Sequence, residues 1–317
     1  MEYYKTYSRY LQEKYGEKVY KLPLNIPVTC PNKVDGPGCS FCADVGTGFE
    51  AMAATFSVKD QLEGTVTIIQ KKYKANKYIA YFQNYTNTYL PLSQFAKYIE
   101  EAAAFPNIVE ISVSTRPDAI AAAYLDILKE QAALHHLEVT IELGLQTVNY
   151  HSLDQIKRGH SLAEYLEAAQ LIKSYGFTLC THVILNLPGD TDRDALETAK
   201  VLSAMKNDIV KIHSLYIAKN TPLAQLYEKG ELSLCSKEEY LERLVLFIRH
   251  LKKEMVVERL FSRIPEQDCL FSNWQTSWWK LKDEFNDKMA AYQAKQGDLC
   301  NYLGGRAVRE FINDRNS

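Results

Sequence analysis

The sequence predicts an α/β protein built on a parallel sheet, followed by a helical C-terminal extension. From about residue 77 to residue 255, short runs rich in β-branched residues alternate with longer amphipathic stretches, which is typical of successive βα units. The strand candidates recur about once every thirty residues, the usual length of one such unit. Six units fit this pattern, and it is compatible both with a partial or closed barrel and with an open doubly wound sheet.

The expected elements follow one another in a regular order along the chain. In each helix, apolar residues recur at spacings of three and four, so each helix offers one face to the sheet. The strands are expected at residues 19–25, 77–83, 109–115, 137–146, 177–187 and 208–218. The helices are expected at residues 58–74, 91–105, 120–134, 162–175, 191–206 and 237–255. We therefore expect residues 1–255 to form the barrel, and residues 256–317, which hold Trp274, Trp278 and Trp279, to pack on it as a helical extension.

Composition indicates a folded enzyme rather than a disordered or membrane protein. Hydrophobic residues make up 46% of the 317 residues and charged residues 24%, as in ordinary globular domains. The net charge of −2 gives no overall basic excess that would indicate nucleic-acid binding. The chain begins without an apolar signal segment and has no apolar run long enough to span a membrane. We expect a cytoplasmic protein with no membrane partner.

Three of the seven cysteines lie close together directly after the first expected strand. Cys30, Cys39 and Cys42 have the spacing C-x8-C-x2-C, at the end of the strand where βα barrels carry their chemistry. Prolines and glycines between them are expected to exclude a helix and to let the backbone wrap tightly: Pro31, Gly36, Pro37 and Gly38. An odd cysteine count without a secretion signal argues against disulfides. The four isolated cysteines are expected to be inert: Cys180, Cys235, Cys269 and Cys300.

The cysteine loop predicts a metal centre. Thiolates bind soft metals, and a C-x2-C pair brings two sulfurs to one centre, as in zinc sites and iron–sulfur clusters. A structural zinc site needs a fourth ligand, and the nearest histidine, His135, lies far along the chain. A four-iron cluster held by three thiolates would leave one iron open. A non-catalytic zinc-binding protein with a distant fourth ligand remains the rival hypothesis.

The cysteine loop, with Phe41 directly before its last cysteine, resembles the radical S-adenosylmethionine (SAM) superfamily. The usual superfamily spacing is C-x3-C-x2-C. The longer first gap resembles the branch that includes the catalytic subunit of Elongator, and the flanking KLPLNIPVTCPN…CSFC is most similar to its YtqA/YhcC-type (MnmL-like) bacterial members. The resemblance covers residues 1 to about 265. It implies a partial (β/α)6 TIM-like barrel of the radical SAM type.

Further motifs follow the later strands in the order that this family requires. They are residues 83–89 (QNYTNTY), 114–118 (STRPD), 142–146 (ELGLQ), 157–160 (KRGH) and 182–189 (HVILNLPG). The first departs from the Gly-Gly-Glu of many relatives, whereas the others are similar to the family's T-R-P-D, E-x-G-x-Q, R-G-H and L-P-G segments. Five motifs in the correct order are specific evidence for the resemblance.

The resemblance implies that Cys30, Cys39 and Cys42 ligate a [4Fe-4S] cluster whose fourth iron binds SAM. No other catalytic residue is assigned. The residues expected to bind SAM are Phe41, Gln83, Thr86, Asn87, Thr88, Arg116, Glu142, Gln146, Arg158 and His182. The two arginines suit the SAM carboxylate, Glu142, Gln146 and His182 suit the ribose, and Phe41 offers its ring to the adenine. Structural roles remain open: Arg116 capping the sheet, Glu142 pairing with a lysine, and His182 as a satisfied core histidine.

The same resemblance implies a reaction and a substrate class. The reduced cluster would split SAM into methionine and a 5′-deoxyadenosyl radical that takes hydrogen from the substrate, with flavodoxin or ferredoxin as reductant. YtqA-type similarity implies tRNA modification at carbon 5 of the wobble uridine, in an aminomethyl or methylaminomethyl pathway, and we expect no room for an acetyltransferase domain. Aromatic residues at 81–89 and 274–279 would stack on an unpaired base, and Lys280, Lys282 and Lys288 would contact phosphates. A small-molecule or protein substrate is the alternative.

Overall fold

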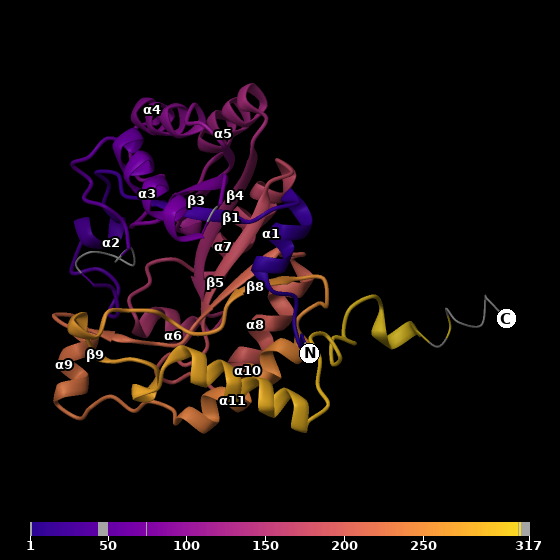
Figure 1. Cartoon of the computed structure of the whole chain (residues 1–317). Helices are drawn as coiled ribbons and strands as arrows, with labels where there is room; N and C mark the ends of the chain where they lie inside the picture. Colours follow the sequence, from indigo (N-terminus) through magenta and orange to yellow (C-terminus); the bar gives the residue numbers. More distant parts are fainter. Residues whose placement is uncertain (1, 44–49, 74, 310, 312–317) are drawn as a thin grey trace.

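Seven parallel strands curl into a half-barrel in the computed structural model, which describes residues 2–43, 50–73, 75–309 and 311 (Figure 1). The strands are β1 (Val19–Leu24), β2 (Lys77–Phe82), β3 (Ile108–Thr115), β4 (Glu138–Gln146), β5 (Thr178–Ile184), β6 (Ile209–His213) and β8 (Val256–Arg259). Their order in the sheet is their order in the chain, so every crossover places the next strand beside the last. The predicted partial barrel is confirmed, and its two edges are β1 and β8.

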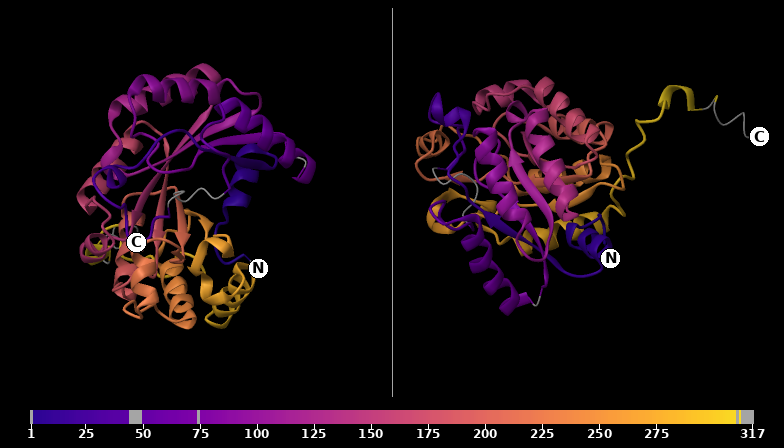
Figure 2. Two further views of the ribbon diagram at one scale, coloured as in Figure 1. Left: turned by 90° about the vertical axis from the view of Figure 1, so that its left-hand side faces the viewer. Right: turned by 90° about the horizontal axis from the view of Figure 1, so that it is seen from above.

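Helices cover the outer face of the curved sheet (Figure 2). In chain order, the helices of the described residues are α1 (Tyr7–Tyr15), α2 (Pro31–Val34), α3 (Val58–Tyr73), α4 (Leu92–Ala103), α5 (Ala122–His135), α6 (Tyr150–Gln155), α7 (Leu162–Ser174), α8 (Asp192–Ala204), α9 (Pro222–Glu228), α10 (Lys237–His250) and α11 (Trp278–Ala291). Capping boxes fix where α7 and α10 begin, at Ser161 with Glu164 and at Ser236 with Glu239. Lys74, the last residue of one predicted helix, lies outside the described residues.

The chain leaves the sheet earlier than predicted at β6, and it returns after α10. The strand predicted at 208–218 ends at His213, because Ser214 donates to Asn273 Oδ1 (2.6 Å) and the Leu215 amide donates to Asn186 Oδ1 (2.6 Å). These side-chain bonds replace the sheet hydrogen bonds there. Residues Ile217–Ala218 form β7, which pairs antiparallel with β9 (Cys269–Phe271). The helix predicted at 237–255 ends at His250, and β8 then pairs with β6.

The cysteine loop contains one helical turn, α2, where the prolines and glycines were expected to exclude any helix. That expectation is wrong because Pro31 occupies the first helical position, where its missing N–H costs nothing. The turn ends before the glycines. Gly38, with φ of 90°, then reverses the chain towards Cys39.

The opening between the two edge strands is partly covered by the N-terminal segment and by α11 (Figure 1). Thr6 forms a parallel bridge to Val257, and the Val257 amide donates to the carbonyl of Lys5 (2.8 Å). Helix α11 buries Phe285 in the core shared by the sheet and its helices, and so forms the predicted helical extension. Among the described residues, no helix is long and apolar enough to cross a membrane.

Candidate functional site

Cys30, Cys39 and Cys42 line one cavity at the carboxyl ends of the barrel strands. None of the three is in a disulfide. The segment after β4 holds the cysteine loop in place: Ser40 donates its amide to the Ile156 carbonyl (2.9 Å), and the Asn32 amide nitrogen donates to the carbonyl of Arg158 (2.9 Å). The loop is therefore positioned by hydrogen bonds to the barrel as well as by its own turns.

Two arginines face the thiols. Arg116 Nη1 lies 3.6 Å from the Cys30 Sγ, and Arg158 Nη1 lies 3.5 Å from the Cys39 Sγ. The other donors of Arg116 bind both oxygens of Asp118 (2.8 and 2.6 Å), and those of Arg158 bind the Gly144 carbonyl (3.3 and 2.8 Å). Each guanidinium thus presents one N–H to a sulfur, an arrangement that stabilises thiolates. A bidentate grip on a SAM carboxylate would require Arg116 to release Asp118.

Two glycines permit this close approach. A Cβ at Gly159, whose φ is 76°, would lie 2.5 Å from Asn32 Oδ1 and 3.0 Å from Arg116 Nη2. A Cβ at Gly144 would lie 2.6 Å from Arg158 Nη2. An added Cβ at either position would force a side chain to move, so the glycines of the ELGLQ and KRGH motifs let Asn32 and the arginines pack closely against the loop.

A buried charge network centred on Glu142 forms the inner wall of the cavity. The Glu142 carboxylate accepts hydrogen bonds from Lys21 Nζ (2.6 Å), Lys211 Nζ (3.0 Å) and His182 Nε2 (2.6 Å). Glu258 accepts from Lys21 (2.9 Å) and forms an ion pair with Lys211 (3.2 Å). Burial favours the protonated form of Glu142, but the two lysines and His182 outweigh it and hold its pKa well below the usual value. The negative charges of the two carboxylates therefore balance the positive charges of the two ammonium groups.

His182 and His213 continue this network as neutral rings. The His182 Nδ1 lies 3.4 Å from the His213 Nε2. Burial lowers the pKa of His182, and Lys211 adds to this effect, which Glu142 opposes. Burial and the neighbouring His182 lower the pKa of His213 well below its usual value. Both rings are therefore uncharged near neutral pH, and each is able to donate one proton and accept another.

The cavity collects nearly all the residues that the sequence assigned to the site. Besides the three cysteines, its lining includes Phe41, Gln83, Thr86, Arg116, Glu142, Gln146, Arg158 and His182. Asn87 and Thr88 do not line it: the Asn87 side chain donates to the carbonyls of Phe82 (3.0 Å) and Ser114 (2.9 Å), and Thr88 is bonded to Thr115 and Ala119. These two residues fix the segment after β2 to the end of β3.

The structure bears out the pairing of Glu142 with a lysine that the sequence left open, but the sequence did not identify the members of the network. Lys21, Lys211 and Tyr81 bond to Glu142 itself, Glu258 pairs with the two lysines, and His213 lies against His182. A signal for two of them was present, because a lysine in the middle of a buried strand, as in VYKLPL and IVKIH, needs an anionic partner inside the barrel. Nothing in the sequence indicates which carboxylate that is.

A second cavity adjoins the first and shares Phe41, Gln83, Gln146 and His182 with it. It extends past His213 to Tyr81, Tyr216 and Arg259. Its walls therefore combine aromatic rings with hydrogen-bonding and cationic groups, as binding sites for polar planar molecules do.

The donor set fits a cluster with an open iron better than zinc. Among the described residues, the three thiols are the only cysteine side chains on the cavity, and His182 is its only histidine. Both His182 nitrogens are engaged elsewhere, with Glu142 and His213, so within the described part of the chain no further cysteine or histidine completes a tetrahedral zinc site with the three thiols. Three thiolates beside arginine N–H groups suit a [4Fe-4S] cluster, whose potential such hydrogen bonds tune.

Comparisons with known proteins agree with this geometry. The profile of the radical SAM superfamily matches residues 24–202, and that of the Radical_SAM C-terminal domain matches residues 207–291. The uncharacterized protein YtqA of Bacillus subtilis is 33% identical over 300 residues, covering 92% of each chain. A tRNA uridine(34) acetyltransferase of Methanocaldococcus jannaschii is 28% identical over 203 residues, covering 63% of this chain and 35% of that protein.

The fold has a close match among solved structures. Elp3 from the archaeon Methanocaldococcus infernus, with its N-terminus deleted, superimposes with a TM-score of 0.66 at 18% identity, covering 88% of this chain and 64% of that one. The superfamily uses a [4Fe-4S] cluster and SAM, and the cavity offers three thiol ligands to such a cluster. The chain therefore belongs to the radical SAM superfamily and is a radical SAM enzyme.

Proposed function

We propose that this radical SAM enzyme modifies tRNA at the side chain on carbon 5 of the wobble uridine, in an aminomethyl or methylaminomethyl pathway. The observation that carries the proposal is the similarity to a tRNA uridine(34) acetyltransferase across 203 residues of the barrel. That similarity covers 35% of the acetyltransferase. The proposal therefore concerns the substrate and not acetyl transfer.

Each group of site residues has a part in the proposed reaction. Cys30, Cys39 and Cys42 hold the cluster, and the Arg116 and Arg158 N–H groups stabilise the negative charge of the cysteine sulfurs. When bound, the cluster and SAM would supply radical chemistry for taking hydrogen from the substrate. The barrel wall would keep water away from the reacting groups.

The second cavity suits a uridine. Tyr81, Tyr216 and Phe41 offer aromatic faces to a planar base. The cavity shares Phe41 and His182 with the cysteine cavity. A base bound there would lie next to SAM.

Mass spectrometry of tRNA nucleosides from a deletion strain tests the proposal. We expect the final wobble-uridine modification to disappear and its precursor to accumulate. A plasmid copy of the gene should restore the modification, as should a copy carrying Cys235→Ala, whereas one carrying Cys42→Ala should not. Unchanged wobble uridines in the deletion strain would refute the proposal and favour a small-molecule or protein substrate.

A biochemical assay complements the genetic one. Anaerobic enzyme supplied with SAM, dithionite and bulk tRNA from the deletion strain should form 5′-deoxyadenosine faster than enzyme supplied with tRNA from the parent strain. Equal rates with both tRNA pools would contradict a role in this modification.

A further inference from the structure

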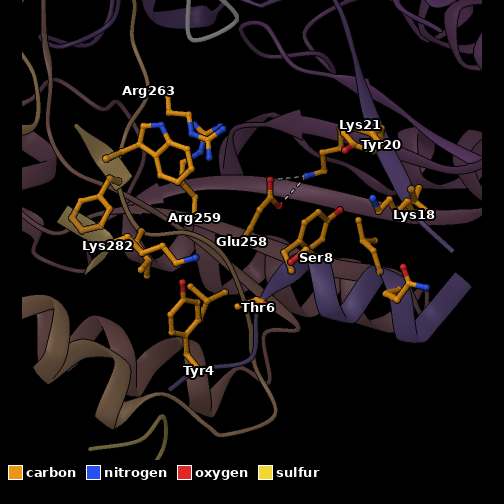
Figure 3. Close-up of a pocket in the computed structure, with 18 of the residues that line it drawn as sticks. Tyr4, Thr6, Ser8, Lys18, Tyr20, Lys21, Glu258, Arg259, Arg263 and Lys282 are labelled. Atoms are coloured by element: carbon orange, nitrogen blue, oxygen red, sulfur yellow. Dashed lines mark hydrogen bonds and ion pairs between the residues drawn. The ribbon is translucent and has the colours of Figure 1, made fainter. Parts of the chain in front are cut away.

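A large cavity lies at the side of the half-barrel, in the opening between β1 and β8 (Figure 3). Its volume is about 530 Å³. The start of β1 forms one wall, the end of β8 and the residues after it form another, and α1 and α11 supply the rest. Its lining shares no residue with the cysteine cavity, so the two are different cavities.

The cavity is strongly cationic. Its lining holds five cations, Lys18, Lys21, Arg259, Arg263 and Lys282, and one acidic residue, Glu258. Glu258 is already bonded to Lys21 (2.9 Å). Figure 3 shows Arg259, Arg263 and Lys282 on one side of the cavity, Lys18 and Lys21 on the other, and Glu258 between them.

Among the described residues, most of these cations have no carboxylate within ion-pair distance, and Lys282 and Arg263 interact only at longer range with Glu2 and Glu50. In the part of the chain that the structure describes, Lys18, Arg259, Arg263 and Lys282 form no salt bridge. By contrast, the buried lysines of the same region, Lys21 and Lys211, are fully paired. In a protein with a net charge of −2, this local excess of positive charge indicates an anionic ligand.

Aromatic rings lie among the cations. Trp278 and Trp279 stand with ring centroids 3.4 Å apart at the start of α11, and Arg263 lies over the Trp278 ring, 4.1 Å from its centroid. The Trp279 side chain is 61% exposed, although tryptophan is usually well buried. Tyr20 lines the opposite wall. Cations that track a phosphate backbone, interleaved with exposed rings that stack on bases, are how proteins bind single-stranded nucleic acid.

We propose that this lateral cavity binds the single-stranded RNA that flanks the nucleotide to be modified, with Arg263 and Lys282 on phosphates and Trp279 stacked on a base. The inference rests on the proposed function, because it takes the substrate to be tRNA. Single-stranded nucleotides of an anticodon loop can unstack and reach such a cavity, whereas the bases of a duplex cannot.

Arg259 connects this cavity to the site. It lines both the lateral cavity and the second cavity, which contains His182 and His213. Lys21, another lining residue, bonds to Glu142 on the wall of the cysteine cavity. An RNA strand held in the lateral cavity would therefore be separated by a single side chain from the cavity proposed for the uridine.

Fluorescence anisotropy with the cluster-loaded full chain tests the inference. The probe is a labelled anticodon stem–loop of a tRNA with a wobble uridine. Trp279→Ala should raise Kd about ten-fold, and Trp279→Phe should restore most of the affinity because it keeps a ring. Arg263→Ala and Lys282→Ala should each raise Kd and reduce the slope of log Kd against log salt by about 0.7.

Lys253→Ala is the matched control, because this lysine is 80% exposed and outside the cavity. It should leave Kd and slope unchanged. All variants should have the melting temperature of the wild type. Without RNA they should also cleave SAM at the wild-type rate, since none of these residues lines the cysteine cavity.

The outcomes separate the two proposals. If the wild type binds the stem–loop and the cavity variants bind it equally well, the lateral cavity is not the RNA site, while the proposed function stands. If the wild type binds neither the stem–loop nor whole tRNA, both proposals fail. The assignment to single-stranded RNA would be overturned by either of two results. One is that poly-glutamate, at the same concentration of negative charge, competes as well as RNA does, and the other is that a blunt RNA duplex binds with the same affinity as the stem–loop.

Discussion

Replacing Glu142 by Gln should destabilise the protein by roughly 3–5 kcal/mol at pH 7, the usual cost of removing one partner from a buried ion pair. The amide keeps the shape of the side chain but not its charge. Glu142 Oε1 accepts from Lys21 and Ser112, and Oε2 accepts from Tyr81, Lys211 and His182. The nitrogen of the amide cannot accept, so one of these two sets of donors loses its partner.

This loss of stability is limited because a buried lysine can give up its proton. In the variant, Glu258 alone must balance Lys21 and Lys211, so one lysine can instead fold in its neutral form. Releasing a proton at pH 7 from a lysine of ordinary pKa, about 10.4, costs about 4.6 kcal/mol. The electrostatic penalty at pH 7 therefore cannot greatly exceed that value.

This limit predicts a pH dependence with a definite sign. The variant lowers the pKa of a lysine in the folded state below its unfolded value, so between those two values the unfolded chain binds more protons and stability rises with pH. From pH 7 to pH 9 the penalty should shrink by up to about 2.7 kcal/mol. In the wild type, burial disfavours the charged form of Lys211, but Glu142 and Glu258 outweigh it and raise its pKa. The wild type therefore lacks this titration.

Urea unfolding followed by tryptophan fluorescence, at pH 7 and pH 9 and at matched cluster content, measures the effect. Glu138→Gln is the matched control, because Glu138 lies on the same strand and pairs with Lys14 (3.2 Å), but is 57% exposed; it should cost less than about 1 kcal/mol. Adding Lys211→Met to Glu142→Gln should recover part of the loss. A Glu142→Gln variant within about 1 kcal/mol of the wild type, with no change between the two pH values, would refute the reasoning.

Three further predictions concern the site and its surroundings. Cys42→Ala should remain folded, since its loop is peripheral to the main core, but should retain little iron and form no 5′-deoxyadenosine, while Cys235→Ala keeps both; deoxyadenosine from Cys42→Ala would contradict cluster ligation. Gly159→Ala should lower cluster retention several-fold more than Gly176→Ala, because both have positive φ but only the first Cβ meets other atoms; equal iron content would count against the packing argument. Burial raises the pKa of Asp190 to about 6, more than its hydrogen-bonding partners lower it, so its stabilising protonated form is lost as pH rises through 6. Asp190→Asn should therefore gain stability over the wild type, by at most about 2 kcal/mol, between melting at pH 4.5 and at pH 7.5, and an unchanged difference would exclude this effect.

The repeating pattern of the sequence determined the barrel. Runs of β-branched residues and a helical period of three to four residues are local patterns, so strands β1 to β5 and helices α3, α4, α5 and α7 were predicted within a few residues, whereas the short helices α2 and α6 were not predicted. Predictions failed where tertiary contacts replaced local ones. Strand β6 ends at His213 because Asn186 and Asn273, both distant in sequence, bond to the chain after it.

The site, too, could be predicted from the sequence only in part. The cysteine spacing, Phe41 and the motif order could be read directly, because a cluster loop needs its ligands within one short segment. The charge network could not be read, since Lys21, Glu142, Lys211 and Glu258 come from four different strands. The sequence alone thus located the candidate metal ligands, which lie within one short segment, and its resemblance to a known family indicated the kind of metal centre. Only the tertiary structure decided which buried charges neutralise one another and that an aromatic, cationic cavity opens between β1 and β8, because both depend on side chains that meet only when the sheet curls.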